Sequence, residues 1–169
     1  MTKAMDSDIT FSRITQENAA EIMRLSRTLS PEQQKLVAPN AVSIVEGVYT
    51  PNSWFRGIYE KETPVGFMML SFGSEFDSGI PHLKDVFLWR YMIAAPHQGR
   101  DIGFLALKKV IRQLQESGYS HFYTSCSMDE GSPYSFYLKC GFIDTGRTIE
   151  DEQLLHIDLR HFNADPGLS

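Results

Sequence analysis

The stretch "LWRYMIAAPHQGRDIGFLAL", residues 88–107, combines a strand pattern, a glycine loop and the start of a helix. The apolar run 86–95 has Arg90 as its one charge, which predicts a strand buried on both faces in the middle of a sheet. The helix that follows has one apolar stripe, made of Gly103, Leu107, Val110, Ile111 and Leu114. A loop that leads from a central strand into a helix presents unpaired N–H groups at the positive end of the helix dipole, where an anion fits.

The rest of the chain alternates between strand and helix patterns. We expect a strand over 9–15, a helix over 15–30 with Thr15 as N-cap, and a second helix over 41–48 capped by Asn40. Further strands are expected at 54–60, 64–72, 119–126, 141–146 and 153–159, and a short helix at 132–140. This order predicts an α/β (α+β) fold, in which helices cover both faces of a mixed sheet.

Length and composition limit the class of protein. The 169 residues, 42% of them hydrophobic, predict a single domain over 1–169 with its core at about 8–160 and dispensable ends. No apolar run is long enough to cross a membrane and no signal-peptide pattern is present, which predicts a cytoplasmic protein without a membrane partner. The net charge of −5 argues against a nucleic-acid partner and is compatible with a cationic one. Cys126 and Cys140 lack metal-ligand spacing, so we expect two reduced, packed thiols and no metal.

The loop Gln98-Gly99-Arg100-Asp101-Ile102-Gly103 is the candidate anion site. Its two glycines allow a phosphate to approach the backbone closely, and Arg100 can add a positive charge. The loop is not the dinucleotide fingerprint, because G-x-G-x-x-G is absent and the loop lies in the middle of the chain instead of after the first strand. A simple turn that binds nothing is the alternative.

These residues resemble the acetyl-CoA-binding motif of the GNAT superfamily of N-acetyltransferases, whose loop pattern is Gln/Arg-x-x-Gly-x-Gly/Ala. Gln98 and Gly103 match the first and last positions, whereas Asp101 stands in place of the middle glycine. Four segments are similar to those of the bacterial diamine (spermidine/spermine) N-acetyltransferase group: "VAPNAVSIVEGVY", "PVGFMMLSF", "FLWRYMI" and "EGSPYSFYLKCGFIDTG". The resemblance extends from Val37 to Gly146 and covers most of the expected domain.

The resemblance implies a mostly antiparallel sheet that is splayed at the cofactor site, with the strand 86–93 diverging from 119–126. Acetyl-CoA, as co-substrate, would place its pantetheine arm in the gap and its pyrophosphate on the amides of Gln98, Gly99, Arg100, Asp101, Ile102 and Gly103. N–H groups near Met92 and Ile93 would donate to the developing oxyanion. We expect the carboxylate of Asp101 to weaken coenzyme binding without abolishing it.

The resemblance also implies a catalytic acid. Tyr137 occupies the position of the superfamily's tyrosine and would protonate the departing thiolate, because a phenol stays protonated at neutral pH. The alternative is that Phe136 and Tyr137 are only a packing pair. Tyr134, one turn earlier, is the weaker candidate.

The general base and the substrate carboxylates are less specific. Base candidates are Glu75 and Asp77 in a loop, Asp85 at the start of the central strand, and Glu130 beside the tyrosine helix. Acidic residues that could hold a cationic substrate are Glu130, Glu150 and Glu152, together with Glu46, Asp129 and Asp151. Each carboxylate could equally be a solvated surface charge. Arg90 should meet a carboxylate or a cluster of carbonyl groups inside the fold, since burying it unpaired is costly; binding an acidic substrate is its second possible role.

The resemblance, together with these residues, implies an enzyme that transfers acetyl from acetyl-CoA to a small-molecule amine by direct attack, with spermidine or spermine as the first choice. An aminoglycoside, an amino acid or a peptide N-terminus is the alternative substrate. A non-catalytic acyl-CoA-binding module is the alternative of another class, and a homodimer is possible.

Overall fold

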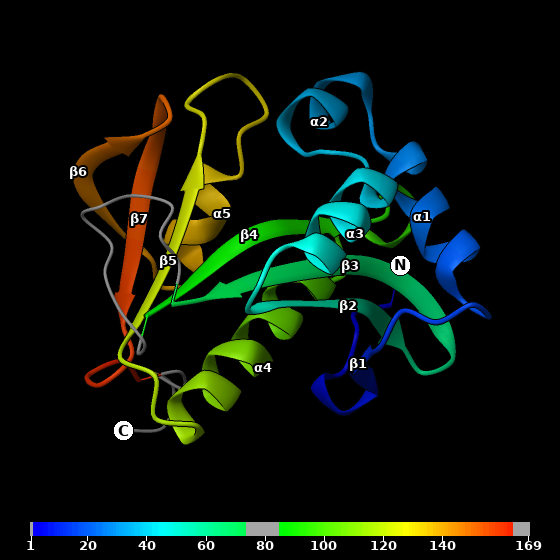
Figure 1. Ribbon diagram of the computed structural model, residues 1–169, viewed down its shortest axis with the longest axis horizontal. Helices are drawn as coiled ribbons and strands as arrows, with labels where there is room; N and C mark the ends of the chain where they lie inside the picture. Colours follow the sequence, from blue (N-terminus) through cyan, green and yellow to red (C-terminus); the bar gives the residue numbers. More distant parts are fainter. Residues whose placement is uncertain (1, 74–84, 164–169) are drawn as a thin grey trace.

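The computed structural model describes residues 2–73 and 85–163, which form a seven-stranded sheet with helices on both faces (Figure 1). The strands are β1 (Ile9–Ser12), β2 (Ser53–Glu60), β3 (Thr63–Phe72), β4 (Asp85–Ile93), β5 (His121–Cys126), β6 (Ile143–Ile149) and β7 (Glu152–Asp158). The helices are α1 (Ala19–Leu25), α2 (Pro31–Leu36), α3 (Asn40–Tyr49), α4 (Ile102–Glu116) and α5 (Tyr134–Lys139).

The sheet has the order β1-β2-β3-β4-β5-β7-β6, and its neighbours are antiparallel except for β4 and β5. Its two faces carry separate apolar cores. One contains the buried stripe of α4 and the ring of Tyr137, and the other contains Ile22 of α1 with Phe67, Met69 and Met92. The predicted fold class is confirmed: a mixed, mostly antiparallel sheet covered by helices on both faces.

The two central strands pair over only part of their length. In the β4–β5 ladder, residues 85–88 lie opposite residues 121–124, but β4 continues to Ile93 and β5 to Cys126. On its other edge β4 has a bulge, because Met69 pairs with Arg90 and Leu70 with Leu88, which leaves Trp89 as the extra residue. A bulge bends a strand and increases its twist. The two strands separate beyond Leu88 and Thr124, as the resemblance implies.

The helices that precede the hairpin differ from the prediction. The expected long helix is replaced by the shorter α1, which is followed by a 3-10 turn at Ser26–Thr28. The helix α2 was not expected. α2 begins with a capping box, in which Ser30 accepts from the Gln33 N–H and the Gln33 side chain accepts from the Ser30 N–H. The sequence pattern Ser-Pro-Glu-Gln is the signal for this helix start, with proline at the first helical position.

Two predicted caps are also wrong. Asn40 is the first residue of α3, and it is buried; its side chain donates to the Ile22 carbonyl (2.8 Å) and so ties α3 to α1. α1 begins after Asn18, whose side-chain oxygen accepts the Thr15 N–H (2.7 Å) in a turn. The Asn40 side chain, which local propensity assigned to a helix cap, is therefore used for a contact between two helices.

The described residues near both chain ends contact the domain. Ala4 N–H donates to the carbonyl of Arg100, and the ring of Phe162 lies against Gly141, where an added Cβ would be 2.4 Å from it. Among the described residues, no helix is long and apolar enough to cross a membrane.

Candidate functional site

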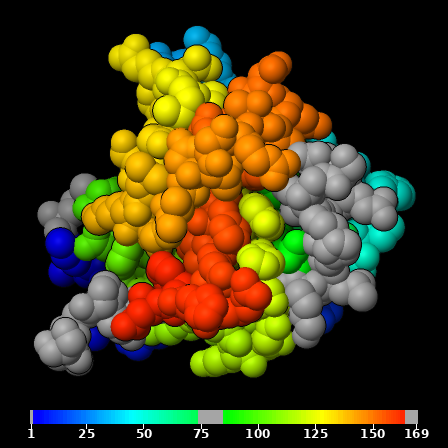
Figure 2. Space-filling view, turned by 90° about the vertical axis from the view of Figure 1, so that its left-hand side faces the viewer, coloured from blue at the N-terminus to red at the C-terminus, as the bar shows by residue number. Residues whose placement is uncertain are grey.

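A cleft of about 890 Å³ occupies the gap between β4 and β5. Its walls come from α2, from the part of β4 beyond Leu88, from the loop before α4, from the end of β5 and from α5. α2 and the connection between β5 and α5 rise above the sheet on either side of the gap (Figure 1), and both reach the top of the molecule in Figure 2. They meet at Gly131, where an added Cβ would lie 3.9 Å from Leu36. Two segments of the wall therefore approach each other at Leu36 and Gly131, which both line the cleft.

The free edge of β4 supplies backbone donors to the cleft. Ala94 N–H donates to Val65 of β3, and the Ile93 carbonyl accepts from Gln98 Nε2 (2.8 Å) on the opposite edge. Because successive residues of a strand direct their N–H groups to opposite edges, Ile93 and Tyr91 present theirs to the gap, whereas Met92 presents its own to β3. Of the two predicted oxyanion donors, Ile93 therefore faces the gap and Met92 does not.

The glycine loop leads from this edge into α4. The side chain of Gln98 exchanges hydrogen bonds with Gln33 of α2 (3.2 and 3.4 Å), so that α2 is attached to the loop. Gly99 has φ of 78°, which favours glycine. The loop residues Gln98, Gly99, Asp101, Ile102 and Gly103 line the cleft, together with His97 and Lys139. The free N–H groups of the α4 start make this part of the cleft suited to an anion.

Arg100 differs from the expectation that its side chain reaches the anion. Its guanidinium makes two hydrogen bonds to the carboxylate of Glu60 (2.9 and 2.8 Å), and its Nε donates to the Thr2 carbonyl (2.7 Å). The hydrogen bonds with Glu60 raise the pKa of Arg100. The side chain is thus committed to β2 and the N-terminal segment.

Lys139 is a cleft-lining cation that the sequence argument missed. Its Nζ lies 5.7 Å from the centre of the Phe104 ring at the start of α4.

Asp101 adopts the backbone conformation that explains the family's glycine. It precedes α4 with φ of 65°, in the left-handed region, and its side chain makes no cap hydrogen bond. Aspartate tolerates this region better than most residues, although at some energetic cost. The carboxylate lies 3.1 Å from Lys3 Nζ, and this exposed contact neutralises part of its charge.

Tyr137 lies where the two strands separate. Its side chain is 6% exposed and packs edge-on against Phe142. Burial raises the pKa of Tyr137, whose hydroxyl lies within hydrogen-bond reach of the Thr124 hydroxyl. Thr124 in turn donates to the Leu88 carbonyl (3.2 Å), at the last paired position of β4 and β5. The phenol is therefore a protonated donor at the apex of the gap. Tyr134 instead donates to Asp144 (2.8 Å).

The turn between β6 and β7 brings carboxylates to the other end of the cleft. Glu150 and Glu152 line it, and Glu152 accepts a hydrogen bond from Ser125 of β5 (2.6 Å). Burial is the main cause that raises the pKa of Tyr137, and the charge of Glu152 is the smallest of the causes that add to it. Glu150 and Asp151 have φ of 49° and 65°, the positive values that the two central residues of a tight two-residue hairpin turn adopt.

Arg90 has the internal partner that its burial requires. Its Nη2 contacts Glu46 of α3 (3.2 Å), and Nη1 donates to the Trp89 carbonyl (3.1 Å). The guanidinium also lies 5.2 Å from the centre of the Trp89 ring. Both Arg90 and Trp89 line the cleft, so the ion pair connects α3 to its wall. Glu46 is consequently committed to Arg90.

The other predicted carboxylates lie apart from this cleft or outside the described residues. Glu130 is exposed and does not line the cleft. Glu75 and Asp77 lie outside the residues that the structure describes. Asp85 is buried at the start of β4, opposite His121, three residues before the strands separate and thus about 10 Å from that point.

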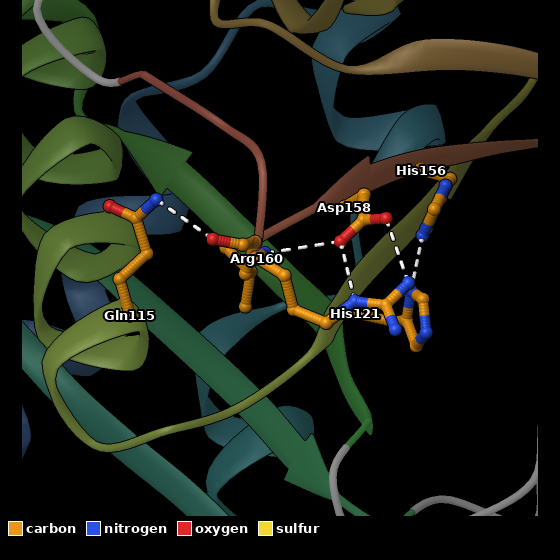
Figure 3. Close-up of polar contacts among 6 residues, drawn as sticks. Gln115, His121, His156, Asp158 and Arg160 are labelled. Carbon is orange, nitrogen blue, oxygen red and sulfur yellow. Dashed lines mark hydrogen bonds and ion pairs between the residues drawn. The ribbon is translucent and has the colours of Figure 1, made fainter.

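Asp85 belongs to a polar cluster at the closed end of the β4–β5 pair. His121 and His156, on neighbouring strands, form a ring-to-ring hydrogen bond of 2.9 Å, and Tyr123 stacks on His156. Asp158 makes two hydrogen bonds with the Arg160 guanidinium beside them (Figure 3). Burial and the neighbouring His121 lower the pKa of His156. In the described part of the chain, no group of three or more potential ligands could hold a metal ion.

The lowered pKa of His156 predicts that acid destabilises the fold. The stabilisation that the fold gains from a neutral His156 is fully present above about pH 6.5, the pKa of a free histidine. This stabilisation is lost as the pH falls through the lower pKa of His156 in the folded protein. We expect His156→Gln to make urea unfolding less dependent on pH between about pH 7 and 5. Wild-type and variant stabilities that fell in parallel over this range would contradict the assignment.

Comparison with known proteins identifies the family. The model of the "Acetyltransferase (GNAT) family" matches residues 21–142, which is more than half of the chain. No curated protein matches the chain. Among solved structures, an acetyltransferase from Thermus thermophilus is 19% identical with a TM-score of 0.69, and the match covers 89% of this chain and 96% of that one.

Two further solved structures have the same fold. The microcin C7 self-immunity acetyltransferase MccE, in complex with acetyl-CoA and AMP, is 20% identical with a TM-score of 0.68; the match covers 89% of this chain and 92% of that one. The PaiA N-acetyltransferase of Thermoplasma acidophilum, in complex with coenzyme A, is 17% identical with a TM-score of 0.62, over 89% of this chain and 98% of that one. The chain, with its splayed sheet and the tyrosine at the apex of the gap, belongs to the GNAT family of acetyltransferases.

Proposed function

We propose that this protein transfers the acetyl group of acetyl-CoA to a primary amine of a small cationic molecule, with spermidine or spermine as the first choice. The observation that carries the proposal is the position of the Tyr137 phenol, in a cleft that is also lined by the glycine loop before α4 and by Glu150 and Glu152. The complexes of MccE with acetyl-CoA and of PaiA with coenzyme A support the choice of co-substrate.

The pyrophosphate of acetyl-CoA would bind at the start of α4. The amides of Gln98 to Gly103 are the donors, and Lys139 supplies the nearby positive charge. The pantetheine arm would follow the free edge of β4, where its amides pair with the backbone groups that β5 leaves unpaired. This path leads the thioester to the apex of the gap.

The reaction then follows from the groups around the thioester. The amine attacks the carbonyl carbon directly, and the resulting oxyanion accepts a hydrogen bond from the N–H of Ile93 or Tyr91. When the C–S bond breaks, the Tyr137 hydroxyl donates its proton to the coenzyme A thiolate. The phenol is protonated at neutral pH before the thiolate forms, because even an unperturbed tyrosine has a pKa of about 10.

The attacking amine has to be held and to lose a proton. Glu152 is the best-placed carboxylate among the described residues, because it lines the cleft near Tyr137, and Ser125 fixes one of its oxygens. Glu150, in the same turn, would bind a second positive charge of a polyamine. Glu75 remains a candidate base, and Asp85 would have to act over a longer path through water.

Removing the charge of Asp101 should strengthen coenzyme binding. Repulsion between an exposed carboxylate and a pyrophosphate is about 1 kcal/mol, so Asp101→Asn should lower the Kd of coenzyme A about fivefold at low salt. The gain should shrink as the salt concentration rises, because salt screens exposed charges. Asp101→Gly, which also relieves the left-handed backbone, should bind at least as tightly. Isothermal titration calorimetry checks this, and an unchanged Kd in both variants would show that the carboxylate does not repel the coenzyme.

Glu152 should affect the acceptor and not the coenzyme. We expect Glu152→Gln to raise the KM for spermidine about tenfold, as one charge-assisted contact is lost, and to leave the KM for acetyl-CoA unchanged. Asp151→Asn is the matched control, since it removes the same charge from the same exposed turn without lining the cleft. Equal effects of the two variants would indicate a general charge effect instead of a binding contact.

The activity itself is tested by the release of coenzyme A, followed with a thiol reagent. The amines are spermine, spermidine, putrescine, an aminoglycoside, several amino acids and a peptide N-terminus. We expect release to depend on polyamines, and we expect Tyr137→Phe to lower kcat about a hundredfold or more because the general acid is lost. Tyr134→Phe, which removes a phenol bonded to Asp144, should have little effect.

The other outcomes separate the parts of the proposal. Release with an aminoglycoside or an amino acid alone would replace the polyamine assignment and keep the reaction. Full activity of Tyr137→Phe would remove the acid assignment. Coenzyme binding without release from any amine would favour a non-catalytic acyl-CoA-binding module.

A further inference from the structure

The loop that precedes α4 contains strained backbone that its own sequence does not stabilise. Gly99 and Asp101 both have positive φ, at 78° and 65°, and only the first is a glycine. A non-glycine residue in the left-handed region persists only when surrounding contacts hold it there. Arg100 lies between these two residues, so its contacts control the direction of both neighbouring peptide groups.

Arg100 is held on three sides by residues remote in sequence. Its guanidinium and the Glu60 carboxylate form a bidentate pair in which the two side chains are only 17% and 18% exposed. Its Nε donates to the Thr2 carbonyl (2.7 Å), and its own carbonyl accepts from the Ala4 N–H (3.0 Å). A bidentate, largely shielded pair is stronger and more directional than an exposed contact.

The N-terminal segment, residues 2–8, is fastened in turn to α4. Arg112 Nη2 contacts the Asp6 carboxylate (2.9 Å). Lys109 Nζ donates to the Asp6 carbonyl (3.5 Å) and to the carbonyl of Ile9, the residue that follows the segment (2.5 Å). The segment also meets the end of the β2–β3 hairpin, where Lys61 N–H donates to the Asp8 carbonyl (2.8 Å). The loop, the middle of α4 and the end of β2 are therefore joined through residues that do not line the cleft.

We propose that the Glu60–Arg100 pair and the N-terminal segment are a positioning device that holds the coenzyme loop in its binding shape. A glycine at the position of Asp101 would adopt the left-handed conformation without strain. Here the contacts of the device hold the loop in that conformation instead. Arg100 then acts through the loop amides and does not touch the phosphates. This inference rests on the assignment of the loop to coenzyme A. A loop that is ordered before binding loses less entropy when the ligand arrives, so the device increases affinity.

The alternative role of Arg100, direct contact with the phosphates, predicts the opposite result for one substitution. Glu60→Gln breaks the pair and releases the guanidinium. If Arg100 binds phosphate, a released cation strengthens coenzyme binding; if it positions the loop, binding weakens. We expect the Kd of coenzyme A to rise about tenfold in Glu60→Gln, with kcat at saturating acetyl-CoA unchanged, because Tyr137 is on another helix.

The matched control is Glu62→Gln, which removes an equal charge from the exposed turn after β2 and should leave the Kd unchanged. The exchange variant Glu60→Arg with Arg100→Glu tests rescue. Positioning predicts that its Kd returns toward that of the wild type, whereas direct contact predicts a further loss, since a carboxylate would face the phosphates. Arg100→Lys, which keeps the charge and loses the bidentate geometry, should resemble Glu60→Gln, and it serves if that variant fails to fold.

Calorimetry with coenzyme A alone tests the positioning role separately from the acetyl-transfer proposal, because the measurement requires neither an amine nor turnover. Tighter binding by Glu60→Gln, or an unchanged Kd with a lower melting temperature, would overturn the positioning role. Wild-type protein that bound no coenzyme A would overturn the loop assignment, and the positioning role with it. Binding without turnover on any amine would leave the device intact and overturn the acetyl-transfer proposal.

Discussion

The parallel pairing of β4 with β5 ends at Leu88 and Thr124, and the site depends on that early end. Beyond it, two strands that continue in the same sheet diverge and leave a cleft between them. The bulge at Trp89, on the opposite edge of β4, bends the strand at the same level. The hydrogen bond from Thr124 to the Leu88 carbonyl closes the last position, and Tyr137 reaches the same hydroxyl. The geometry of strand separation thereby locates the candidate acid. Buried N–H and C=O groups without partners destabilise a fold, so the edge that β5 leaves unpaired favours a ligand with matching amides.

Charge is distributed along the cleft in a way that suits two substrates of opposite sign. Lys139 lies near Phe104 at the start of α4, whereas Glu150 and Glu152 come from the turn between β6 and β7 and the start of β7. Two ion pairs beside the cleft neutralise the charges of two further arginines. Glu46 neutralises Arg90 at the α3 wall, and Glu60 holds Arg100 behind the loop. A polyanionic coenzyme and a cationic amine would therefore be drawn to different ends, with the thioester between them.

Local pattern determined the elements and the motif of this protein. The apolar strand around Arg90, the amphipathic stripe of α4 and the loop from Gln98 to Gly103 are readable from the sequence because they depend on neighbours along the chain. The capping box at Ser30 was equally readable and would have predicted α2. The candidate acid, Tyr137, was identified from its position in a segment that resembles that of the superfamily.

Tertiary structure decided which polar groups meet. No spacing in the sequence relates Arg100 to Glu60, Glu152 to Ser125 or Arg90 to Glu46, because each pair joins strands or helices that only the sheet order brings together. The same holds for Met92 and Ile93, whose N–H directions follow from the pairing of β4 with β3. Asp85 and Glu152 look equivalent as acidic residues in the sequence. The point at which two strands separate places one of them at the closed end and the other in the cleft.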